Sequence, residues 1–325
     1  MNVLVLSAGR RVSLVRAFQE AMRRLELPGR VLTADMRPAL SAACQVAERR
    51  ELPYVLSEEY PEALARLCQE EGIALAIPTI DTELAVLAGL REKFAARGTE
   101  LVVSNLDLVR RCRDKRLTQG LFEGIGLPTP RLYRGGDLHF PLFAKPVSGS
   151  MSLGIRVFTS AHELEHSGID LEAYLLMEVV SAKDWEEVTL DVYYDRHGAL
   201  KGLVPRRRTE VRSGEISKGW TDKSLLPSLR PIFEKVMGAR GCLTAQVFAH
   251  HHSEALLGIE INPRFGGGFP LSERAGARYP EWLLREYLLG QSLEYREDWE
   301  DRLMMLRYDA EVWTQYPIVS PELPP

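Results

Sequence analysis

The chain has 325 residues, of which 45% are hydrophobic and 26% charged, with a formal net charge of −4. This length is large for one compact core and predicts two or three lobes. The slightly acidic balance gives no reason to expect a nucleic-acid partner. Charges interrupt every apolar run before it reaches the length of a membrane span, so no membrane partner is expected.

The N-terminus and the cysteines indicate the cellular compartment of the protein. The N-terminal residues lack the cationic start and long apolar core of a signal peptide and are predicted to form a first strand. The four cysteines, Cys44, Cys68, Cys112 and Cys242, lie far apart and form no Cys-x-x-Cys pair. We therefore expect a cytoplasmic protein with reduced, mostly buried thiols.

Short apolar runs alternate with amphipathic segments in the first hundred residues. The pattern predicts strands at 2–6, 31–34, 74–77 and 101–103 and helices at 12–25, 44–49, 57–71 and 79–94, the last capped by Thr79 or Asp81. This alternation is typical of an α/β fold with a doubly wound parallel sheet, here an N-terminal domain over residues 1–106.

Ligands of such sheets bind at the carboxyl ends of the strands. Five side chains are expected there, although each could instead cap a helix or lie in solvent: Arg10, Arg11, Asp35, Thr79 and Asp81. The dinucleotide fingerprint needs Gly-x-Gly-x-x-Gly after the first strand, and only Gly9 is present. A nicotinamide-dependent oxidoreductase is therefore excluded.

The middle of the chain contains a glycine-rich loop between two predicted strands. A helix at 106–123, carrying Asp114 and Lys115, ends at a Gly- and Pro-rich break over 124–130 that predicts a lobe boundary. Strands at 140–145 and 155–158 flank the Gly- and Ser-rich residues 146–154, whose backbone N–H groups could close over phosphates. No Gly-Lys-Ser/Thr leads into a helix, so this loop is not a Walker A motif. A helix at 161–165 and a strand at 174–180 follow.

The last third is predicted to be mainly antiparallel. Strands at 188–194 and 199–204 are joined by a turn at 195–198, and residues 206–219 are expected to form a polar loop. A helix at 225–238, paired strands at 243–249 and 255–261, a helix at 281–289, a strand at 303–308 and a tail over 313–325 complete the prediction.

The stretch from Gly258 to Pro270 carries the strongest chemical signal. Glu260 and Asn262 share one face of a strand, and Gln246 on the neighbouring strand adds a third oxygen donor. Oxygen donors with one negative charge suit Mg²⁺ held jointly with nucleotide phosphates, whereas zinc would favour histidine or cysteine. Arg264 could bind a phosphate, although Asn262 alone could equally belong to an ordinary Asn-Pro turn. His250–His252 are predicted to form a solvated turn.

Two lysines and two glutamates extend this candidate site. Lys115 and Lys145 are candidates for phosphate binding, although either one alone could be a surface lysine. Lys145 is the stronger candidate, because it ends an apolar strand just before the glycine-rich loop. The carboxylates of Glu178 and Glu187 could accept hydrogen bonds from an adenine amino group or from ribose hydroxyls. A solvated strand end explains either glutamate equally well.

In their order along the chain, these residues resemble the ATP-grasp superfamily. The resemblance covers roughly residues 1–310. Within the superfamily, the sequence is most similar to the synthetase units of the carbamoyl-phosphate synthetase large subunit, and it also resembles single-unit relatives such as the amide ligase of the pyrrolysine pathway. It rests on Pro78-Thr-x-Asp-x-Glu83, Asp114-Lys115, Lys145-Pro146, Gly149, Gly154, Met177-Glu178, Glu187, Asp191, Pro205-Arg206, Gln246 and Glu260–Gly268.

The resemblance implies a fold and a set of roles. The fold is an N-terminal pre-ATP-grasp domain followed by an ATP-grasp domain over 107–312, with a flap-bearing lobe at 116–178 and a metal-bearing lobe at 179–312. Lys115, Lys145, Ser148, Gly149, Ser150 and Gly154 would bind the ATP phosphates, Glu178 and the backbone near Val180 the adenine, and Glu187 the ribose. Gln246, Glu260 and Asn262 would hold Mg²⁺, with Mn²⁺ as a substitute, and Arg264, Lys145 and Asn262 would be catalytic.

The implied reaction is an ADP-forming ligation. A small-molecule carboxylate would attack ATP to form an acyl phosphate, which an amine would convert to an amide. A small-molecule kinase and a non-catalytic nucleotide-binding protein are the alternatives. Arg206, Arg212, Glu215 and Arg11 are candidate substrate contacts, although each could be a solvated charge, and a homodimer is compatible with the sequence.

Overall fold

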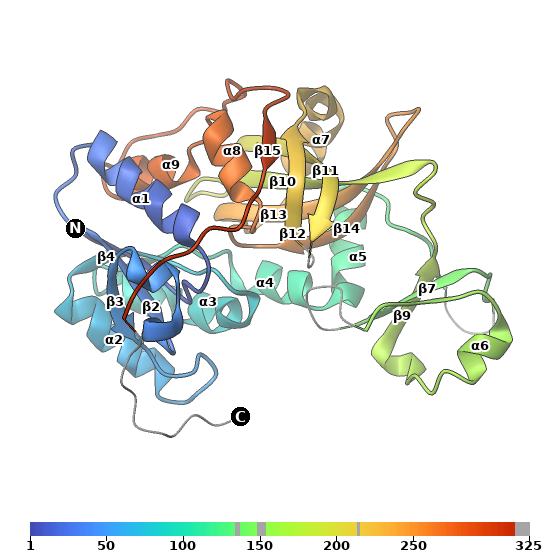
Figure 1. Ribbon diagram of the computed structural model, residues 1–325, viewed down its shortest axis with the longest axis horizontal. Coiled ribbons are helices and arrows are strands. Elements are labelled where there is room, and N and C mark those ends of the chain that lie inside the picture. Colours follow the sequence, from blue (N-terminus) through green and yellow to red (C-terminus); the bar gives the residue numbers. More distant parts are fainter. Residues whose placement is uncertain (134–136, 148–153, 213–214, 316–325) are drawn as a thin grey trace.

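The computed structural model describes residues 1–133, 137–147, 154–212 and 215–315. Three sheets form the framework of the molecule. In Figure 1 the N-terminal domain lies at the lower left, an antiparallel sheet with its helices forms the central body, and a small lobe projects to the right. The predicted contacts Ser148, Gly149 and Ser150 lie outside the described residues.

The N-terminal sheet is parallel, with strand order β3-β2-β1-β4-β5. Its strands are β1 (Asn2–Val5), β2 (Val31–Asp35), β3 (Glu48–Glu51), β4 (Ile73–Ile77) and β5 (Glu100–Leu101), and its helices are α1 (Val12–Arg24), η1 (Pro38–Leu40), η2 (Ala43–Gln45), α2 (Tyr60–Glu70) and α3 (Asp81–Ala95). Val3 and Val5 pack with α1, whereas Leu4 and Leu6 pack with α2 and α3. Both faces are covered, so the predicted doubly wound α/β fold is confirmed.

The helix predicted at 44–49 is wrong. The chain forms only the short η2 there and then enters the edge strand β3. That strand reads Glu-Arg-Arg-Glu and is mostly exposed, so it lacks the apolar alternation that would have revealed it. Charged residues of this kind protect an exposed edge from pairing with another chain.

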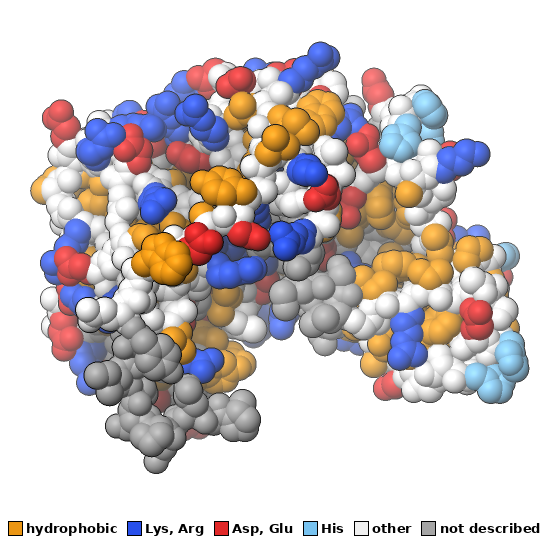
Figure 2. Space-filling model, in the orientation of Figure 1, with side chains coloured by type: hydrophobic (Ala, Val, Ile, Leu, Met, Phe, Trp, Pro, Cys, Tyr) orange, Lys and Arg blue, Asp and Glu red, His pale blue; other side chains and the backbone are white. Residues whose placement is uncertain are grey.

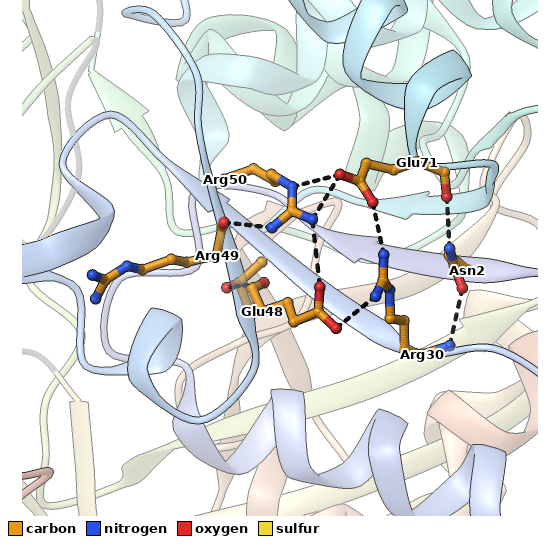
Figure 3. A network of polar contacts seen from close by, with 7 residues as sticks. Asn2, Arg30, Glu48, Arg49, Arg50 and Glu71 are labelled. Atoms are coloured by element: carbon orange, nitrogen blue, oxygen red, sulfur yellow. Dashed lines mark hydrogen bonds and ion pairs between the residues drawn. The ribbon is translucent and has the colours of Figure 1, made fainter.

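Ion pairs join the amino ends of these strands (Figure 3). Nη1 of Arg30 lies 2.8 Å from Glu48, its Nη2 lies 3.0 Å from Glu71, and Nη2 of Arg50 lies 2.6 Å from Glu71. Asn2 donates to the Glu71 carbonyl at 2.6 Å and accepts from the Arg30 N–H at 3.0 Å. The network connects three strands to the end of α2. It lies at the amino ends of the strands, away from the carboxyl ends where ligands bind, so we assign it a structural role.

Two short helices replace the single helix predicted at 106–123. They are α4 (Leu106–Arg113) and α5 (Lys115–Gly124), which meet at Asp114. Asp114 is extended and accepts a hydrogen bond from the backbone N–H of Arg116, so it caps α5. The break places Lys115 at the first position of α5, facing the small lobe, where its N–H donates to the Val147 carbonyl.

The small lobe is an antiparallel sheet with strand order β6-β9-β7-β8. It contains β6 (Leu132–Tyr133), β7 (Leu142–Pro146), β8 (Arg156–Phe158), α6 (Ala161–Glu165), η3 (Leu171–Ala173) and β9 (Tyr174–Glu178). A separate apolar cluster around Leu142, Phe158 and Leu176 forms its core. Figure 2 shows that the molecule is hollowed between this lobe and the central body.

The central sheet has the order β14-β13-β10-β11-β12-β15, and all its pairs are antiparallel. Its elements are β10 (Trp185–Tyr194), β11 (Leu200–Arg212), β12 (Glu215–Thr221), η4 (Lys223–Leu225), α7 (Leu226–Phe233), β13 (Gly241–His250), β14 (Leu256–Asn262), α8 (Phe269–Ala275), α9 (Tyr279–Tyr287) and β15 (Met304–Leu306). Tyr193 packs against Tyr279 and Trp282, whereas the Tyr194 hydroxyl donates to the Phe233 carbonyl, so helices cover both faces.

Residues 206–219, predicted to form a polar loop, belong mostly to strands β11 and β12. The many arginines concealed the strand pattern, because buried ion pairs replace apolar side chains on the inner face of β11. The helix α8 directly after the glycine run was also missed. No described helix is long and apolar enough to cross a membrane.

Candidate functional site

Strands β13 and β14 bring the three predicted oxygen donors onto one face of the central sheet. Gln246 lies opposite Glu260, and Thr244 lies opposite Asn262. Asn262 donates from Nδ2 to Oε1 of Glu260 at 3.0 Å. The predicted metal ligands therefore lie side by side at the end of the sheet.

Lys145 reaches this face from the small lobe. Its Nζ lies 3.5 Å from Oε2 of Glu260, and its side chain is only 13% exposed. Lys115 lies beside it and donates from Nζ to the Pro146 carbonyl at 2.9 Å. Burial, followed by the positive charge of Lys145, lowers the pKa of Lys115 from its ordinary value. Lys145 therefore meets Glu260 across the boundary between the lobes, with Lys115 beside it, an arrangement suited to binding phosphates.

The Gln246 amide lies between two carboxylates and an arginine. One terminal atom of the amide is 3.3 Å from Oε1 of both Glu187 and Glu260, and the other is 3.2 Å from Nη1 of Arg208. With nitrogen facing the carboxylates, the amide forms hydrogen bonds with all three neighbours. With oxygen facing them, three oxygens converge, which is favourable only around a cation. We assign the nitrogen-facing orientation to the metal-free protein.

Arg208 belongs to this site, although sequence reasoning gave it no specific role. It forms an ion pair with Glu187 as well as its contact with Gln246. Burial lowers the pKa of its guanidinium, and the charge of Glu260 opposes that shift. The signal that could have found Arg208 is the alternation of a strand, which places residues 206 and 208 on the same face as Glu187 and Gln246.

Arg264 is paired across the domain boundary. Its Nε and Nη2 donate to the two oxygens of Asp81 at 2.9 and 2.6 Å, and its Nη1 donates to the Phe265 carbonyl at 3.1 Å. Asp81 is the first residue of α3, at the carboxyl edge of the parallel sheet. The expectation that Asp81 lies at that edge is confirmed, and its partner there is Arg264.

Two glycines of the run after Arg264 are needed for close packing. A Cβ on Gly266 would lie 2.6 Å from Oγ1 of Thr244, and one on Gly268 would lie 2.2 Å from Nη1 of Arg206. Thr244 also donates to the Arg264 carbonyl at 3.1 Å. These contacts fix the turn that carries Arg264 against the neighbouring strands.

The remaining predicted nucleotide contacts lie along the small lobe. Glu178, at the end of β9, accepts a hydrogen bond from the Arg131 N–H at 2.8 Å. Val180 follows it in the segment that leads to the central sheet. Gly154 has φ +76°, and a Cβ there would lie 3.0 Å from Cγ of Pro146, so the residues on either side of the flap approach closely.

The predicted substrate residues are scattered. Arg206 is 1% exposed and forms a bidentate ion pair with Asp191 at 2.7 and 3.1 Å, which argues against direct substrate contact. Arg212 is 75% exposed and pairs with Asp309 at 3.3 Å. Glu215 begins β12, and its backbone pairs with Arg212. Arg11 precedes α1 at the carboxyl edge of the parallel sheet, as expected.

A narrow cavity of about 30 Å³ lies between α5, the small lobe and β14. Lys115 and Lys145 line it, with the apolar side chains of Leu132, Met177 and Ile259. Its volume is close to that of one water molecule.

Comparisons with known proteins identify both parts of the chain. Residues 3–102 match the family model for the PylC-like N-terminal domain. Residues 170–309 match the family model described as ATP-grasp in the biosynthetic pathway with Ter operon.

Two curated relatives agree with these matches. The chain is 30% identical over 125 residues to the 3-methyl-D-ornithine–L-lysine ligase of Methanosarcina mazei, covering 38% of this chain and 32% of the ligase. It is 22% identical over 243 residues to the carbamoyl phosphate synthase large chain of Methanothermobacter thermautotrophicus, covering 66% of this chain and 23% of that protein. The chain thus spans a third or less of the length of these relatives.

Solved structures share the fold. The biotin carboxylase domain of Hydrogenobacter thermophilus 2-oxoglutarate carboxylase, in complex with MgADP and bicarbonate, aligns with a TM-score of 0.72 at 18% identity, covering 93% of this chain and 73% of that one. N5-carboxyaminoimidazole ribonucleotide synthetase from Thermus thermophilus aligns with a TM-score of 0.68 at 21% identity, covering 93% and 81%. The comparisons thus identify a PylC-like N-terminal domain in residues 3–102 and an ATP-grasp domain in residues 170–309.

Proposed function

We propose that this protein is an ATP- and Mg²⁺-dependent ligase that joins a small-molecule carboxylate to an amine and releases ADP and phosphate. The observation that carries the proposal is the meeting of Lys145, from one lobe, with Glu260 and its neighbouring donors, from the other. The similarity to a 3-methyl-D-ornithine–L-lysine ligase and to a protein of the same fold solved with MgADP supports it. The boundaries at residues 106 and 312 remain part of this proposal.

The donor set fits Mg²⁺. Gln246, Glu260 and Asn262 offer oxygen ligands on the protein side. When the oxygen of the Gln246 amide is turned toward Glu187 and Glu260, three oxygens converge, and that orientation is favourable only around a cation. Among the described residues, no group of three or more His, Cys, Asp or Glu side chains could hold a metal. The remaining ligands would therefore come from nucleotide phosphates and water, as is common for Mg²⁺.

The other nucleotide contacts follow from the same arrangement. Lys115 and Lys145 would neutralise the phosphates, and the loop between Pro146 and Gly154 would cover them. Glu178 and the backbone near Val180 would bind adenine, and Glu187 would bind the ribose. Arg208 holds Glu187 and Gln246 in place for these roles.

The chemistry asks the protein mainly to position reactants and neutralise charge. The substrate carboxylate attacks the γ-phosphorus of ATP, the bond to ADP breaks, and an acyl phosphate forms. The amine then attacks the acyl carbon, phosphate leaves, and the amide remains. When bound, Mg²⁺ supplies neutralisation of phosphate charge. Arg264 binds an oxygen of the acyl phosphate, and the closed lobes exclude water from it.

The proposal extends to the residues that would bind the acid and the amine. Arg212, Glu215 and Arg11 stay candidate contacts for these substrates, and Mn²⁺ could substitute for Mg²⁺. The need for ATP favours a cytoplasmic location. A homodimer is also proposed, since one neighbour of the same fold is described as a dimer.

Two measurements test the function. Titration calorimetry with MgADP should show binding that is weakened at least about 10-fold in Glu260→Gln. Glu254→Gln, an exposed carboxylate in the turn before β14, is the matched control and should bind normally. Equal affinities in all three proteins would refute the metal assignment.

The second measurement uses a panel of carboxylates with MgATP and hydroxylamine. Formation of a hydroxamate with release of ADP and phosphate would establish an acyl phosphate and hence a ligase. ADP release that yields a stable phosphorylated product, without any hydroxamate, would identify a kinase instead. MgADP binding without turnover on any acid would favour a nucleotide-binding protein.

A further inference from the structure

The contact between Asp81 and Arg264 joins two domains at the candidate site. The residues are 183 positions apart in the chain, and their side chains are 17% and 15% exposed. Asp81 comes from the parallel sheet's carboxyl edge, near the point between β1 and β4 where the strand order reverses. Arg264 follows the predicted metal ligand Asn262 by two residues.

The geometry of this pair leaves one side of Arg264 open. A guanidinium has five N–H groups. Asp81 and the Phe265 carbonyl take three of them, leaving one on each terminal nitrogen without a partner among the described residues. Two neighbouring N–H groups can bind a carboxylate or phosphate through two parallel hydrogen bonds. Arg264 can therefore be held by Asp81 and bind an oxyanion at the same time.

The helix start that carries Asp81 is fixed by hydrogen bonds to Glu83. Two residues along α3, the fully buried carboxylate of Glu83 accepts hydrogen bonds from the backbone N–H groups of Thr79 at 2.6 Å and Ile80 at 3.1 Å. Its other oxygen accepts from the Ser7 hydroxyl at 2.7 Å. Ser7 has φ +47°, an uncommon backbone conformation for a residue other than glycine. The start of α3 is thus fixed to the end of β1.

We propose that Asp81 is a positioning residue that orients Arg264 toward the reacting oxyanion, so that the N-terminal domain forms part of the active site. The inference rests on the proposed function. It assigns Asp81 no contact with substrate: its effect passes entirely through Arg264. The role of α3 and its buried carboxylate is then to keep this orientation from relaxing.

The test is a double-mutant cycle. The proteins are the wild type, Asp81→Asn, Arg264→Ala and the double variant, and the probe is inorganic phosphate titrated into each MgADP complex. Asp107→Asn, an exposed carboxylate in the first turn of α4, is the matched control for the loss of an acidic residue at a helix start. The melting temperature is recorded for each protein.

We expect Asp81→Asn to weaken phosphate binding at least about 10-fold while MgADP affinity stays within about twofold. In the Arg264→Ala background, the same substitution should change phosphate affinity by less than about twofold, because the residue through which it acts is gone. Asp107→Asn should bind phosphate normally.

An unchanged phosphate affinity in Asp81→Asn, or an equal effect with and without Arg264, would overturn the proposal. If Asp81→Asn does not fold, Asp81→Glu carries the test, because it keeps the charge at the helix start but moves the carboxylate. Failure of the proposed function would appear differently, as loss of MgADP binding in the wild type itself.

Discussion

The ammonium of Lys145 lies 3.5 Å from the carboxylate of Glu260, although the two residues belong to different lobes and are 115 positions apart. Lys145 contacts Oε2 of Glu260, whereas Asn262 and Gln246 lie at its Oε1. Binding of a metal nucleotide would exchange the partners: the carboxylate would gain the metal and the lysine would gain a phosphate. The pair thus holds both side chains at the boundary between the lobes.

Lys145→Met tests whether this lysine binds a phosphate of the nucleotide. The substitution keeps most of the side-chain volume and removes the cation, so we expect MgADP affinity to fall at least about 10-fold. Titration calorimetry measures this directly. Lys93→Met, on the exposed face of α3, is the control and should have no effect. Wild-type affinity in Lys145→Met would contradict a phosphate role for Lys145.

Gln246→Leu should change the metal requirement. It removes the amide between Glu187 and Glu260 while keeping a side chain of similar size, so we expect half-maximal nucleotide binding to need at least about fivefold more Mg²⁺. A Mg²⁺ titration at fixed ADP checks this. Gln69→Leu, exposed on α2, provides the comparison. An unchanged Mg²⁺ requirement would exclude Gln246 as a ligand.

Gly258→Ala should destabilise the fold through overpacking. A Cβ at this position would lie 2.5 Å from the ring of Phe122, which packs α5 against β14. We expect a loss of about 1–3 kcal/mol in the free energy of unfolding, measured with urea. Gly89→Ala, where no atom lies within 4 Å of the added Cβ, should instead stabilise α3 by about 0.5–1 kcal/mol. Adding Phe122→Leu to Gly258→Ala should restore part of the loss.

The contribution of Glu83 to the stability of the protein should fall as the pH rises toward neutrality. Complete burial raises the pKa of Glu83 from 4.5 to about 7, and hydrogen bonds from Ser7 and from backbone N–H groups oppose this shift. The folded state therefore binds the Glu83 proton more tightly than the unfolded chain does. Stability from this group is present below pH ~4.5 and is lost by pH ~7, by about 3 kcal/mol in total.

Thermal unfolding of Glu83→Gln between pH 4.5 and 7.5 tests this. The variant should lose this part of the pH dependence, since glutamine does not titrate. Burial also raises the pKa of Glu273 to about 7. Glu273→Gln should therefore remove a second, separate part of the pH dependence of stability over the same pH range. A Glu83→Gln variant with the wild-type pH profile would show that Glu83 does not titrate in this window.

Much of the fold follows from local patterns. The N-terminal strands were predictable because Val3 to Leu6 are apolar on both faces, as the central strand of a parallel sheet requires. The edge strand β3 was not, because its charged residues are stabilised by pairing partners such as Glu71 that come from elsewhere in the chain. The same reason hid the second part of strand β11, beyond the strand predicted at 199–204, where Arg206 is neutralised by Asp191 on the adjacent strand.

The sequence alone determined the alternating N-terminal fold, the ordered set of ATP-grasp residues and the shared face of Glu260 and Asn262, because these depend on spacing and strand period. Only the tertiary structure decided which charges meet. It placed Lys145 on Glu260, Arg208 between Glu187 and Gln246, Arg206 in the core and Arg264 on Asp81. Ion pairs between distant segments leave no local pattern, since a charged side chain looks the same in sequence whether water or a partner surrounds it.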